Sequence, residues 1–279
     1  MPELPEVEVI RRELAPLICG KSFAEPVLFY ERAIRYPRPK EFSRRLPGRC
    51  IVELGRKGKY LFFELDRGLL LGHLRMTGKL LYCAPGAALD NPTAPEKDLR
   101  VKLPFAEGGA LYFYDMRKFG GFWLLEDLEE CRAAGLSLPG PDIWEELDES
   151  TFVAMLQGRP RARIKPLLLD QHFAAGMGNI YTDESLFRSG IHPCRRVQTL
   201  TEEESALLYR TIRDVLAAGI ACGGTTTRDY RDARGAEGSF QNFLTVYGRK
   251  GEPCTHCSRP IERIVVAGRG THFCPHCQK

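Results

Sequence analysis

The first eighteen residues combine polar and apolar side chains with the period of an α-helix. Apolar residues recur every three or four positions, and charged residues fill most of the positions between them. The apolar set is Val7, Ile10, Leu14, Leu17 and Ile18. This pattern predicts an amphipathic helix over residues 5–18, with one face turned toward a protein core.

The segments that follow change to short apolar and aromatic runs. They lie at residues 60–65, 69–71, 79–82 and 110–114, and Gly or Pro residues occur between them. Runs of this kind are typical of β-strands. We therefore expect a β-sandwich that is capped by the N-terminal helix.

Beyond residue 150 the helical period returns, over residues 151–156, 165–170, 180–189 and 201–218. The last of these begins with Thr201 and Glu204, the spacing of a helix capping box. Two prolines and a glycine at 139–141 interrupt regular structure and indicate a linker between the two halves. The fold class is therefore expected to be multidomain α+β.

Four cysteines near the C-terminus have the spacing of a zinc ribbon. Cys254 and Cys257 form one Cys-x-x-Cys pair, Cys274 and Cys277 form the other, and sixteen residues separate the pairs. Four thiolates fill a tetrahedral site and leave no position for a reactive water, so we expect one structural zinc ion and no organic cofactor. The neighbouring histidines at 256, 272 and 276 are alternative ligands, but the cysteines have the better symmetry.

Composition limits the class of protein further. A chain of 279 residues with 43% hydrophobic content can bury real cores, and its length suggests more than one domain. The other six cysteines have no pairing pattern, and neither a signal peptide nor a membrane-spanning apolar run is evident. We therefore expect a cytoplasmic protein with no membrane partner.

The formal net charge of +4 conceals an uneven distribution. Residues 120–150 hold nine acidic side chains against one basic one, which leaves a net +6 on residues 1–119 and +6 on residues 151–279. Two basic regions suit a polyanion that is held from two sides. Basic residues that only solvate two surfaces would give the same count.

Pro2 is the first candidate for chemistry. Removal of Met1 would leave Pro2 as a free secondary amine beside the carboxylate of Glu3. An α-amino group titrates near pH ~8 and a lysine side chain near ~10.4, so much of such an amine is an uncharged nucleophile at neutral pH. The alternative is that Glu3 and Glu6 only favour the start of a helix.

A glycine-rich turn precedes the helix predicted at 180–189. Gly176 and Gly178 allow tight turns there and leave backbone amides free at the start of the helix. Such amides bind phosphate well. An ordinary connection between two helices would look the same.

Nine motifs, in this order, resemble the formamidopyrimidine-DNA glycosylase family, the bacterial repair enzymes for oxidised purines. The resemblance covers essentially the whole chain. Its carriers are PELPEVE at 2–8, GKY at 58–60, GHLRMTG at 72–78, RKFG at 117–120, IKP at 164–166, GMGNIY at 176–181, GIHP at 190–193, VYGRKG at 246–251 and the zinc ribbon.

The resemblance implies a domain arrangement with DNA in a cleft. It assigns an N-terminal catalytic β-sandwich domain to residues 1–133 and a helix-two-turn-helix DNA-binding domain to 134–222. A lesion-recognition loop and connector would occupy 223–244, and a zinc finger 245–279. The implied partner is double-stranded DNA that contains oxidised purines, bound by a monomer that associates with the nucleoid.

The resemblance also implies residue roles in a glycosylase and AP lyase. Pro2 would attack the sugar and form a Schiff base, Glu3 would be the general acid, and β,δ-elimination would cut the strand. Glu6 would support this chemistry. Lys59, Lys165 and Arg269 are implied to be further catalytic residues. Lys59 and Arg269 match family residues that contact phosphate, and Lys165 matches one that affects the handling of oxidised guanine. Asn179 and Tyr181 fall in a phosphate-binding turn.

Further residues match those that fill the space left by the flipped base and those that recognise the damaged base. Met76, Arg117 and Phe119 match the residues inserted where a base is flipped out, with Arg117 donating to the orphaned cytosine. For Met76 and Phe119, core packing is the alternative. The loop matched to lesion recognition contains Thr225, Thr227, Arg228, Asp229 and Tyr230.

Two alternatives and one departure stay open. The related endonuclease VIII branch, which removes oxidised pyrimidines, begins Pro-Glu-Gly-Pro-Glu and has a shorter loop, whereas Leu4 stands here. A catalytically silent DNA-binding paralogue would be expected to lack Pro2 or Glu3. The family's usual His-x-His pair is replaced by Asp98-Leu99-Arg100, and Arg100 could supply part of a phosphate or lesion contact.

Overall fold

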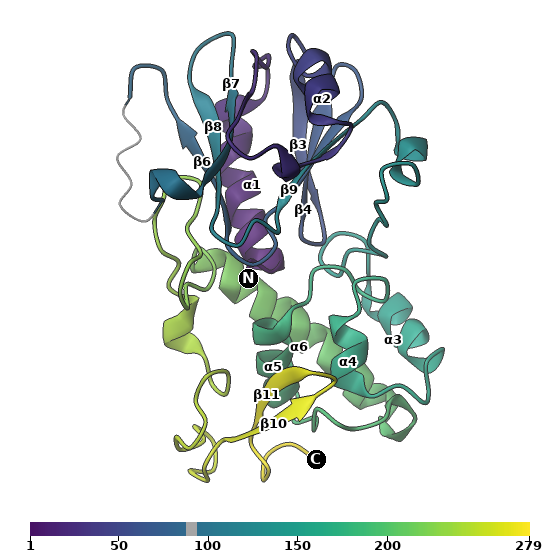
Figure 1. Cartoon of the computed structure of the whole chain (residues 1–279). Helices are drawn as coiled ribbons and strands as arrows, with labels where there is room; N and C mark the ends of the chain where they lie inside the picture. The colour runs from purple at the N-terminus through teal and green to yellow at the C-terminus, as the bar shows by residue number, and fades with distance from the viewer. Residues whose placement is uncertain (88–93) are drawn as a thin grey trace. The chain divides into compact units, whose positions relative to one another are not determined.

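The computed structural model describes residues 1–87 and 94–279 and divides into two compact units (Figure 1). The first unit contains residues 1–138 together with 222–239. The second contains residues 139–221 together with 240–279. The division at 138/139 falls at the Pro-Gly-Pro linker. The segment expected as one loop and connector, 223–244, is divided between the units after Ser239.

The first unit is a β-sandwich. One sheet has the order β2-β9-β5-β4-β3, and the other has the order β1-β7-β8-β6. Neighbouring strands are antiparallel except β2 and β9, which are parallel. The strands are β1 (Val27–Leu28), β2 (Ile34–Tyr36), β3 (Ile51–Lys57), β4 (Tyr60–Leu65), β5 (Leu69–His73), β6 (Gly78–Cys83), β7 (Leu99–Pro104), β8 (Ala110–Asp115) and β9 (Gly121–Leu125).

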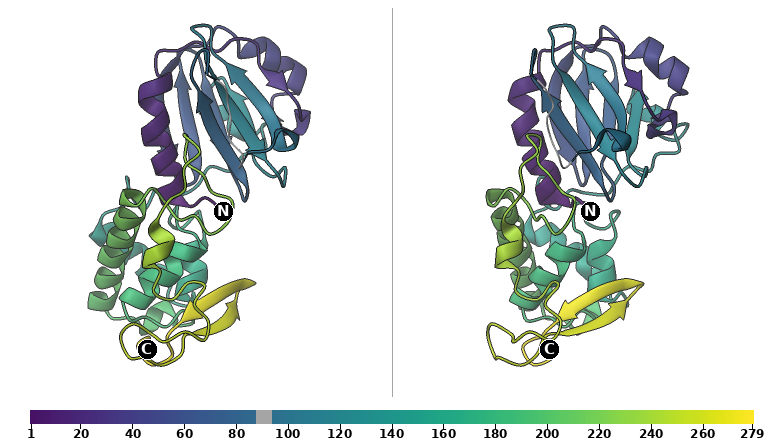
Figure 2. Two further views of the ribbon diagram at one scale, coloured as in Figure 1. Left: turned by 90° about the vertical axis from the view of Figure 1, so that its left-hand side faces the viewer. Right: turned by 60° about the vertical axis from the view of Figure 1, so that its left-hand side comes forward.

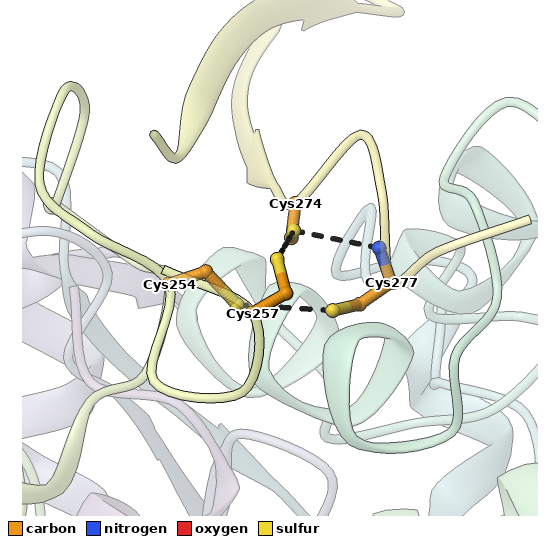
Figure 3. Close-up of side chains that lie close together, drawn as sticks. All are labelled: Cys254, Cys257, Cys274 and Cys277. Atoms are coloured by element: carbon orange, nitrogen blue, oxygen red, sulfur yellow. Dashed lines mark hydrogen bonds between the residues drawn. The ribbon is translucent and has the colours of Figure 1, made fainter. Parts of the chain in front are cut away.

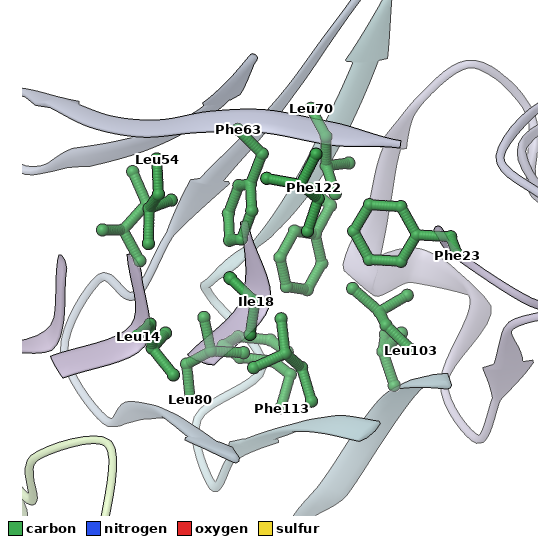
Figure 4. Close-up of a cluster of buried hydrophobic side chains, with 14 of the residues drawn as sticks. Leu14, Ile18, Phe23, Leu54, Phe63, Leu70, Leu80, Leu103, Phe113 and Phe122 are labelled. Carbon is green, nitrogen blue, oxygen red and sulfur yellow. The ribbon is translucent and has the colours of Figure 1, made fainter. Parts of the chain in front are cut away.

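Apolar side chains from both sheets meet in the interior of the sandwich. Phe63 and Phe122 from one sheet face Leu80 and Phe113 from the other (Figure 4). Helix α1 (Leu4–Ile18) runs along the side of the sandwich and adds its buried face to the same core (Figure 2). The expected sandwich with an N-terminal helix is confirmed.

The 222–239 segment is anchored to the first unit. Tyr230 and Ala233 belong to the buried core of the sandwich. The amide of Tyr82 on β6 donates to the carbonyl of Ala233 at 3.1 Å. The ends of the segment are joined by a bond from the amide of Ser239 to the carbonyl of Cys222, at 2.8 Å. The unit also contains α2 (Pro39–Arg45) and short 3₁₀ turns at Glu31–Ala33, Glu96–Asp98 and Leu128–Cys131.

The second unit is mainly helical. Its helices are α3 (Glu149–Gln157), α4 (Ile164–Leu169), α5 (Asn179–Arg188) and α6 (Glu202–Ala221), with 3₁₀ turns at Val197–Thr199 and Phe240–Phe243. The expected capping box of α6 is present, because Thr201 and Glu204 exchange hydrogen bonds of 3.1 and 2.8 Å. A Cβ atom at Gly219 would lie 2.5 Å from the ring of Tyr181, so glycine lets α6 approach α5 closely.

A hairpin of two strands, β10 (Glu262–Val266) and β11 (Arg269–Phe273), completes the second unit. The turn residues Ala267 and Gly268 have φ angles of +47° and +75°. Two consecutive positive φ angles are the conformation of the tight turn that matches the twist of antiparallel strands. The turn therefore places Arg269 at the tip of the hairpin, where its side chain is exposed. Within residues 1–87 and 94–279, no helix is both long and apolar enough to cross a membrane.

Candidate functional site

The start of the chain forms a buried cluster at the first turn of α1. Pro2 and Glu3 are buried, whereas Met1 is 41% exposed. The backbone amide of Glu3 donates to Oε2 of Glu6 at 2.7 Å, which fixes the direction in which the chain enters the helix. The Pro2 nitrogen is part of a peptide bond as long as Met1 is present. Removal of Met1 would create the amine within this buried cluster.

Glu6 also binds the 222–239 segment. Its Oε1 atom accepts a hydrogen bond of 2.7 Å from the backbone amide of Thr225. Tyr230 reinforces the contact, since its hydroxyl lies 3.4 Å from the Glu6 carbonyl oxygen and donates to it. Burial, followed by the nearby charge of Glu6, raises the pKa of Tyr230, so the phenol keeps the proton that it donates.

The five residues expected to recognise the lesion divide into anchors and surface residues. Thr225 and Tyr230 are buried, at 4% and 6% exposure. Thr227 and Arg228 are exposed. Asp229 is half-buried and lines a pocket with Lys79 and Lys97. Thr225 and Tyr230 therefore anchor the segment, and Thr227 and Arg228 between them face solvent.

Lys59 lies in the turn between β3 and β4, where Gly58 has a φ of +58°. Lys59 is buried, and its positive charge acts on His73 of β5. Burial first, and then the charges of Arg75 and Lys59, lower the pKa of His73 to about 3. The neutral ring accepts a hydrogen bond of 2.9 Å at Nδ1 from the amide of Arg75. His73 therefore supports the Arg75 turn without adding another positive charge.

The three residues expected to fill the space left by the flipped base lie on two turns of the first unit. Phe119 is 50% exposed, Arg117 is exposed and Met76 is half-buried. The guanidinium carbon of Arg117 lies 4.7 Å from the centre of the Phe119 ring, in cation–π contact. Core packing is therefore the wrong explanation for Phe119. Each turn contains a non-glycine residue with positive φ, Arg75 at +52° and Lys118 at +61°.

Arg100 does not present its guanidinium for a phosphate contact. The residue is 7% exposed. Its Nε donates to the carbonyl of Asp115 at 2.8 Å, and its Nη1 donates to the carbonyl of Lys97 at 2.7 Å. Its Nη2 bonds the carboxylate of Asp98 at 3.2 Å. The side chain that replaces a family histidine thus supports the turn after β8, and the direct contact expected of it is not favoured.

The second unit holds the expected phosphate-binding turn. Gly178 precedes α5, and Asn179 is its first residue. The Asn179 Nδ2 donates to the carbonyl of Gly270 at 2.9 Å, which links the helix to the β10–β11 hairpin. Tyr181 is completely buried and stacks on Phe240 with ring centres 5.5 Å apart. Its side chain therefore belongs to the core, so any contact between Tyr181 and DNA would have to come from its backbone.

Lys165 is also fully buried. Its Nζ forms an ion pair of 2.5 Å with Asp183 on α5 and bonds the carbonyl of Gly270 at 3.3 Å. The other carboxylate oxygen of Asp183 accepts from the amide of His272 at 2.9 Å. Two helices thus hold the hairpin that carries Arg269. Lys165 thus contacts both α5 and the hairpin, and the catalytic role expected of it from the sequence stays a prediction.

The four zinc-ribbon cysteines converge on one point (Figure 3). Their sulfur atoms lie within 4.8 Å of one another, and the Cys254–Cys277 and Cys257–Cys274 pairs are 3.9 and 3.5 Å apart. Zinc–sulfur bonds of about 2.3 Å in a tetrahedron place the sulfurs ~3.8 Å apart, so the donor set fits zinc. Among the residues that the structure describes, the group that could hold a metal ion consists of these four cysteines, and His256, His272 and His276 are not part of it. The protein has a structural zinc site made of cysteines.

Sequence reasoning missed the residues that connect these parts. Asp115, Thr77 and Asp183 are buried polar residues whose partners are distant in the chain or on another element. For Asp115 there was one available signal, because an acidic residue at the end of an apolar strand, beside a glycine-containing turn, is typical of a side chain that caps backbone amides.

Models of three protein-family domains match the chain. They are the formamidopyrimidine-DNA glycosylase N-terminal domain at residues 1–122, its H2TH domain at 139–231, and a zinc finger found in FPG and IleRS at 251–279. Curated formamidopyrimidine-DNA glycosylases from Pelotomaculum thermopropionicum and Geobacillus kaustophilus are each 43% identical over 280 residues. The alignments cover 100% of this chain and 99% and 100% of those proteins.

Solved structures give the same result. A point mutant of the Lactococcus lactis FPG, in complex with DNA containing Fapy-dG, is similar with a TM-score of 0.87 and 39% identity. The Lactococcus lactis Fpg bound to DNA containing an abasic site is similar with a TM-score of 0.86 and 39% identity. Both similarities cover 100% of each chain.

Proposed function

Since the chain belongs to the formamidopyrimidine-DNA glycosylase family and is a bifunctional DNA glycosylase and AP lyase acting on oxidised purines, we propose that Pro2 is its nucleophile. The observation that carries this proposal is the buried cluster of Pro2, Glu3 and Glu6 at the first turn of α1. The cluster would hold the amine beside a carboxyl group once Met1 is removed.

The reaction needs the damaged base to leave the helical stack, because its sugar carbon is not accessible within a duplex. The uncharged amine of Pro2 attacks C1′, and the bond from C1′ to the base breaks with its electrons passing to the base, which takes up the proton that the amine loses. Glu3 protonates the sugar ring oxygen as the ring opens. The product is an iminium ion, which cannot lose its charge because a secondary amine retains no proton after it forms the double bond.

Strand cleavage follows from this iminium ion. Its charge acidifies the neighbouring C2′, so a base can remove a proton there and expel the 3′ phosphate. A second elimination expels the 5′ phosphate, and water then releases Pro2. Glu3 can carry protons in both directions. Lys59 and Arg269 are the further catalytic residues that we assign to the phosphate groups at which the eliminations occur.

We assign DNA binding to residues of both units. The protein binds damaged duplex DNA, and each unit offers its own cationic or amide-rich contacts. In the second unit, the first-turn amides of α5 and the remaining Nδ2 hydrogen of Asn179 are suited to a phosphate, as is exposed Arg269. Lys165 would act through Gly270 by holding the Arg269 hairpin in place.

We assign two further tasks to residues of the first unit. One is to fill the space that the flipped base leaves in the DNA, and the other is to recognise the oxidised purine. The exposed ring of Phe119 and the thioether of Met76 would replace lost stacking, and Arg117 would donate to the orphaned cytosine. The 222–239 segment would close over the oxidised purine through Thr225, Thr227, Arg228, Asp229 and Tyr230. We further infer that the protein acts as a monomer in the cytoplasm at the nucleoid.

The substrate assignment is tested with three duplexes that carry 8-oxoguanine, a formamidopyrimidine or an oxidised pyrimidine at one site. Single-turnover rates should be at least tenfold higher for the two purine lesions. Equal or faster release of the oxidised pyrimidine would contradict the purine assignment. Light scattering of the free and DNA-bound protein checks the monomer, and a dimer under both conditions would contradict it.

A further inference from the structure

The turn that carries Arg117 and Phe119 is built around a buried carboxylate. Asp115, at the end of β8, is completely inaccessible to solvent. Its Oδ2 accepts a hydrogen bond of 2.8 Å from the amide of Gly120, and its Oδ1 accepts one of 3.2 Å from the amide of Arg117. One side chain therefore binds both ends of the exposed turn and fixes the backbone from which Arg117 projects.

The same carboxylate reaches the other turn through Thr77. The Thr77 hydroxyl lies 2.5 Å from Oδ1 of Asp115, and the hydroxyl oxygen also accepts from the amide of Arg117 at 3.1 Å. Thr77 directly follows Met76 in the chain and is itself buried. A single hydroxyl thus joins the Met76 turn to the Arg117 turn.

Two arginines hold this arrangement from other sides. The Nε of Arg100 donates to the Asp115 carbonyl at 2.8 Å. The Nη2 of Arg35 lies 3.0 to 3.2 Å from the carbonyl oxygens of three successive residues, 118–120, and donates toward them. The turn needs such support because Lys118 has a φ of +61°, which costs about 1 kcal/mol in a residue other than glycine.

We propose that Asp115 and Thr77 are positioning residues that hold the Met76 and Arg117 turns as one rigid piece and thereby set the enzyme's preference for cytosine opposite the lesion. The inference rests on the proposed function, in which Arg117 reads the orphaned base. A ring can stack in many orientations. A guanidinium that distinguishes the acceptors of cytosine from those of adenine must be placed within a few tenths of an ångström. Loosening the turns should therefore reduce base discrimination more than it reduces chemistry.

Five variants separate these effects. Thr77→Val keeps the shape of the side chain and removes the hydroxyl, whereas Thr77→Ser keeps the hydroxyl. Asp115→Asn keeps the size and one acceptor oxygen, but places an amide donor against one of the backbone amides. Thr211→Val is a matched control, because it makes the same exchange at a buried threonine of α6. Arg117→Ala removes the reading side chain itself.

The measurement is the ratio of single-turnover excision rates for 8-oxoguanine opposite cytosine and opposite adenine, with borohydride trapping on a preformed abasic site as the readout of chemistry. Thr77→Val and Asp115→Asn should lower the ratio about tenfold and change trapping less than threefold, whereas Thr77→Ser and Thr211→Val should keep the wild-type ratio.

The outcomes separate the inference from the function on which it rests. If Arg117→Ala leaves the ratio unchanged, the proposed reading role of Arg117 fails. If Arg117→Ala lowers the ratio but Thr77→Val does not, the reading role stands and the positioning inference is overturned. Thermal unfolding is followed for each variant, and Thr77→Val decides the question if Asp115→Asn does not fold. An equal loss of trapping and excision for Thr77→Val would also overturn the inference.

Discussion

The carboxylate of Glu6 accepts a hydrogen bond of 2.7 Å from the backbone amide of Thr225, 219 residues further along the chain. The same carboxylate binds the backbone amide of Glu3 through its other oxygen. The residue that we assign as general acid and the segment that we assign to base recognition are therefore attached to opposite oxygens of one side chain. Displacement of the 222–239 segment should therefore slow excision of the damaged base more than it slows cleavage at an abasic site.

Gly224 tests this connection. Its φ is +89°, and a Cβ atom there would lie 2.9 Å from the Tyr230 ring and 3.0 Å from Cγ of Glu6. We expect Gly224→Ala to displace the segment and slow excision of 8-oxoguanine at least tenfold, while cleavage of a preformed abasic site changes less than threefold. Single-turnover assays on the two duplexes measure this difference.

Gly223→Ala is the matched control. Gly223 also has a positive φ, of +70°, but the nearest atom to a Cβ there is 3.7 Å away, on Gly238. It therefore carries the backbone strain without the collision, and excision should fall less than in Gly224→Ala. Equal effects of the two substitutions would show that strain alone accounts for the loss.

The buried ion pair of Lys165 and Asp183 distinguishes a positioning role from direct DNA contact. Lys165→Met leaves a buried carboxylate unpaired, which should lower the free energy of unfolding by about 3 kcal/mol. It should also weaken binding to abasic-site DNA about tenfold, because the Arg269 hairpin is loosened. Denaturant unfolding and fluorescence anisotropy measure the two effects.

A double variant, Lys165→Met with Asp183→Asn, provides the control. It removes both charges and keeps an oxygen that can accept from the amide of His272. Stability and DNA binding should both recover most of the loss if Lys165 acts through the hairpin. Recovery of stability without recovery of binding would mean that Lys165 contacts the DNA itself.

Loss of a zinc ligand should affect the C-terminal ribbon selectively. Cys274→Ser removes one of four ligands that pack with Phe187 and Ile261 in a small core. We expect less than one zinc ion per chain and loss of DNA binding, with most of the helical circular dichroism kept because α3 to α6 have their own contacts. Cys19→Ser is the control, because Cys19 is exposed and is not one of the four ligands. The Cys19→Ser protein should retain one zinc ion per chain. A full zinc content in Cys274→Ser would contradict the four-cysteine site.

His73 should make the protein less stable in mild acid. Burial lowers its pKa to about 3 in the folded protein, whereas an unfolded chain binds the proton near pH ~6.5. Between these values the unfolded state holds more protons, so the free energy of unfolding falls as pH falls below ~6.5. His73→Gln lacks this contribution. From pH 7 to pH 5, the free energy of unfolding of the wild type should therefore fall by about 2 kcal/mol more than that of the variant. Parallel pH curves for zinc-loaded proteins would contradict this account.

Much of the architecture could be predicted from the sequence because periodic burial leaves a periodic trace. The buried face of α1, the strand runs and the Cys-x-x-Cys spacing each depend on neighbours within a few residues, as does the exchange of bonds between Thr201 and Glu204. Periodicity did not identify the exposed pair of Arg117 and Phe119, because an exposed aromatic residue leaves no periodic signal. That pair was predicted only from the family motifs.

The remaining features depend on contacts between distant parts of the chain. Nothing adjacent to Lys165 in the sequence shows that its charge is buried against Asp183, and nothing near Tyr181 shows that Gly219 leaves room for its ring. Motif similarity identified Lys165 and Tyr181 as candidate site residues, but packing decides which side chains reach a ligand. Arg100 is the clearest case, because its charge satisfies carbonyl groups of its own fold.

The most direct test of the central claim is borohydride trapping of the protein on a duplex with one 8-oxoguanine opposite cytosine, after intact mass has verified removal of Met1. The expected result is a stable covalent adduct for the wild type, a reduced amount for Pro2→Gly, whose terminal amine is primary, and none for Glu3→Gln. Absence of an adduct from the processed wild type, with DNA binding intact, would contradict the assignment of Pro2 as the nucleophile.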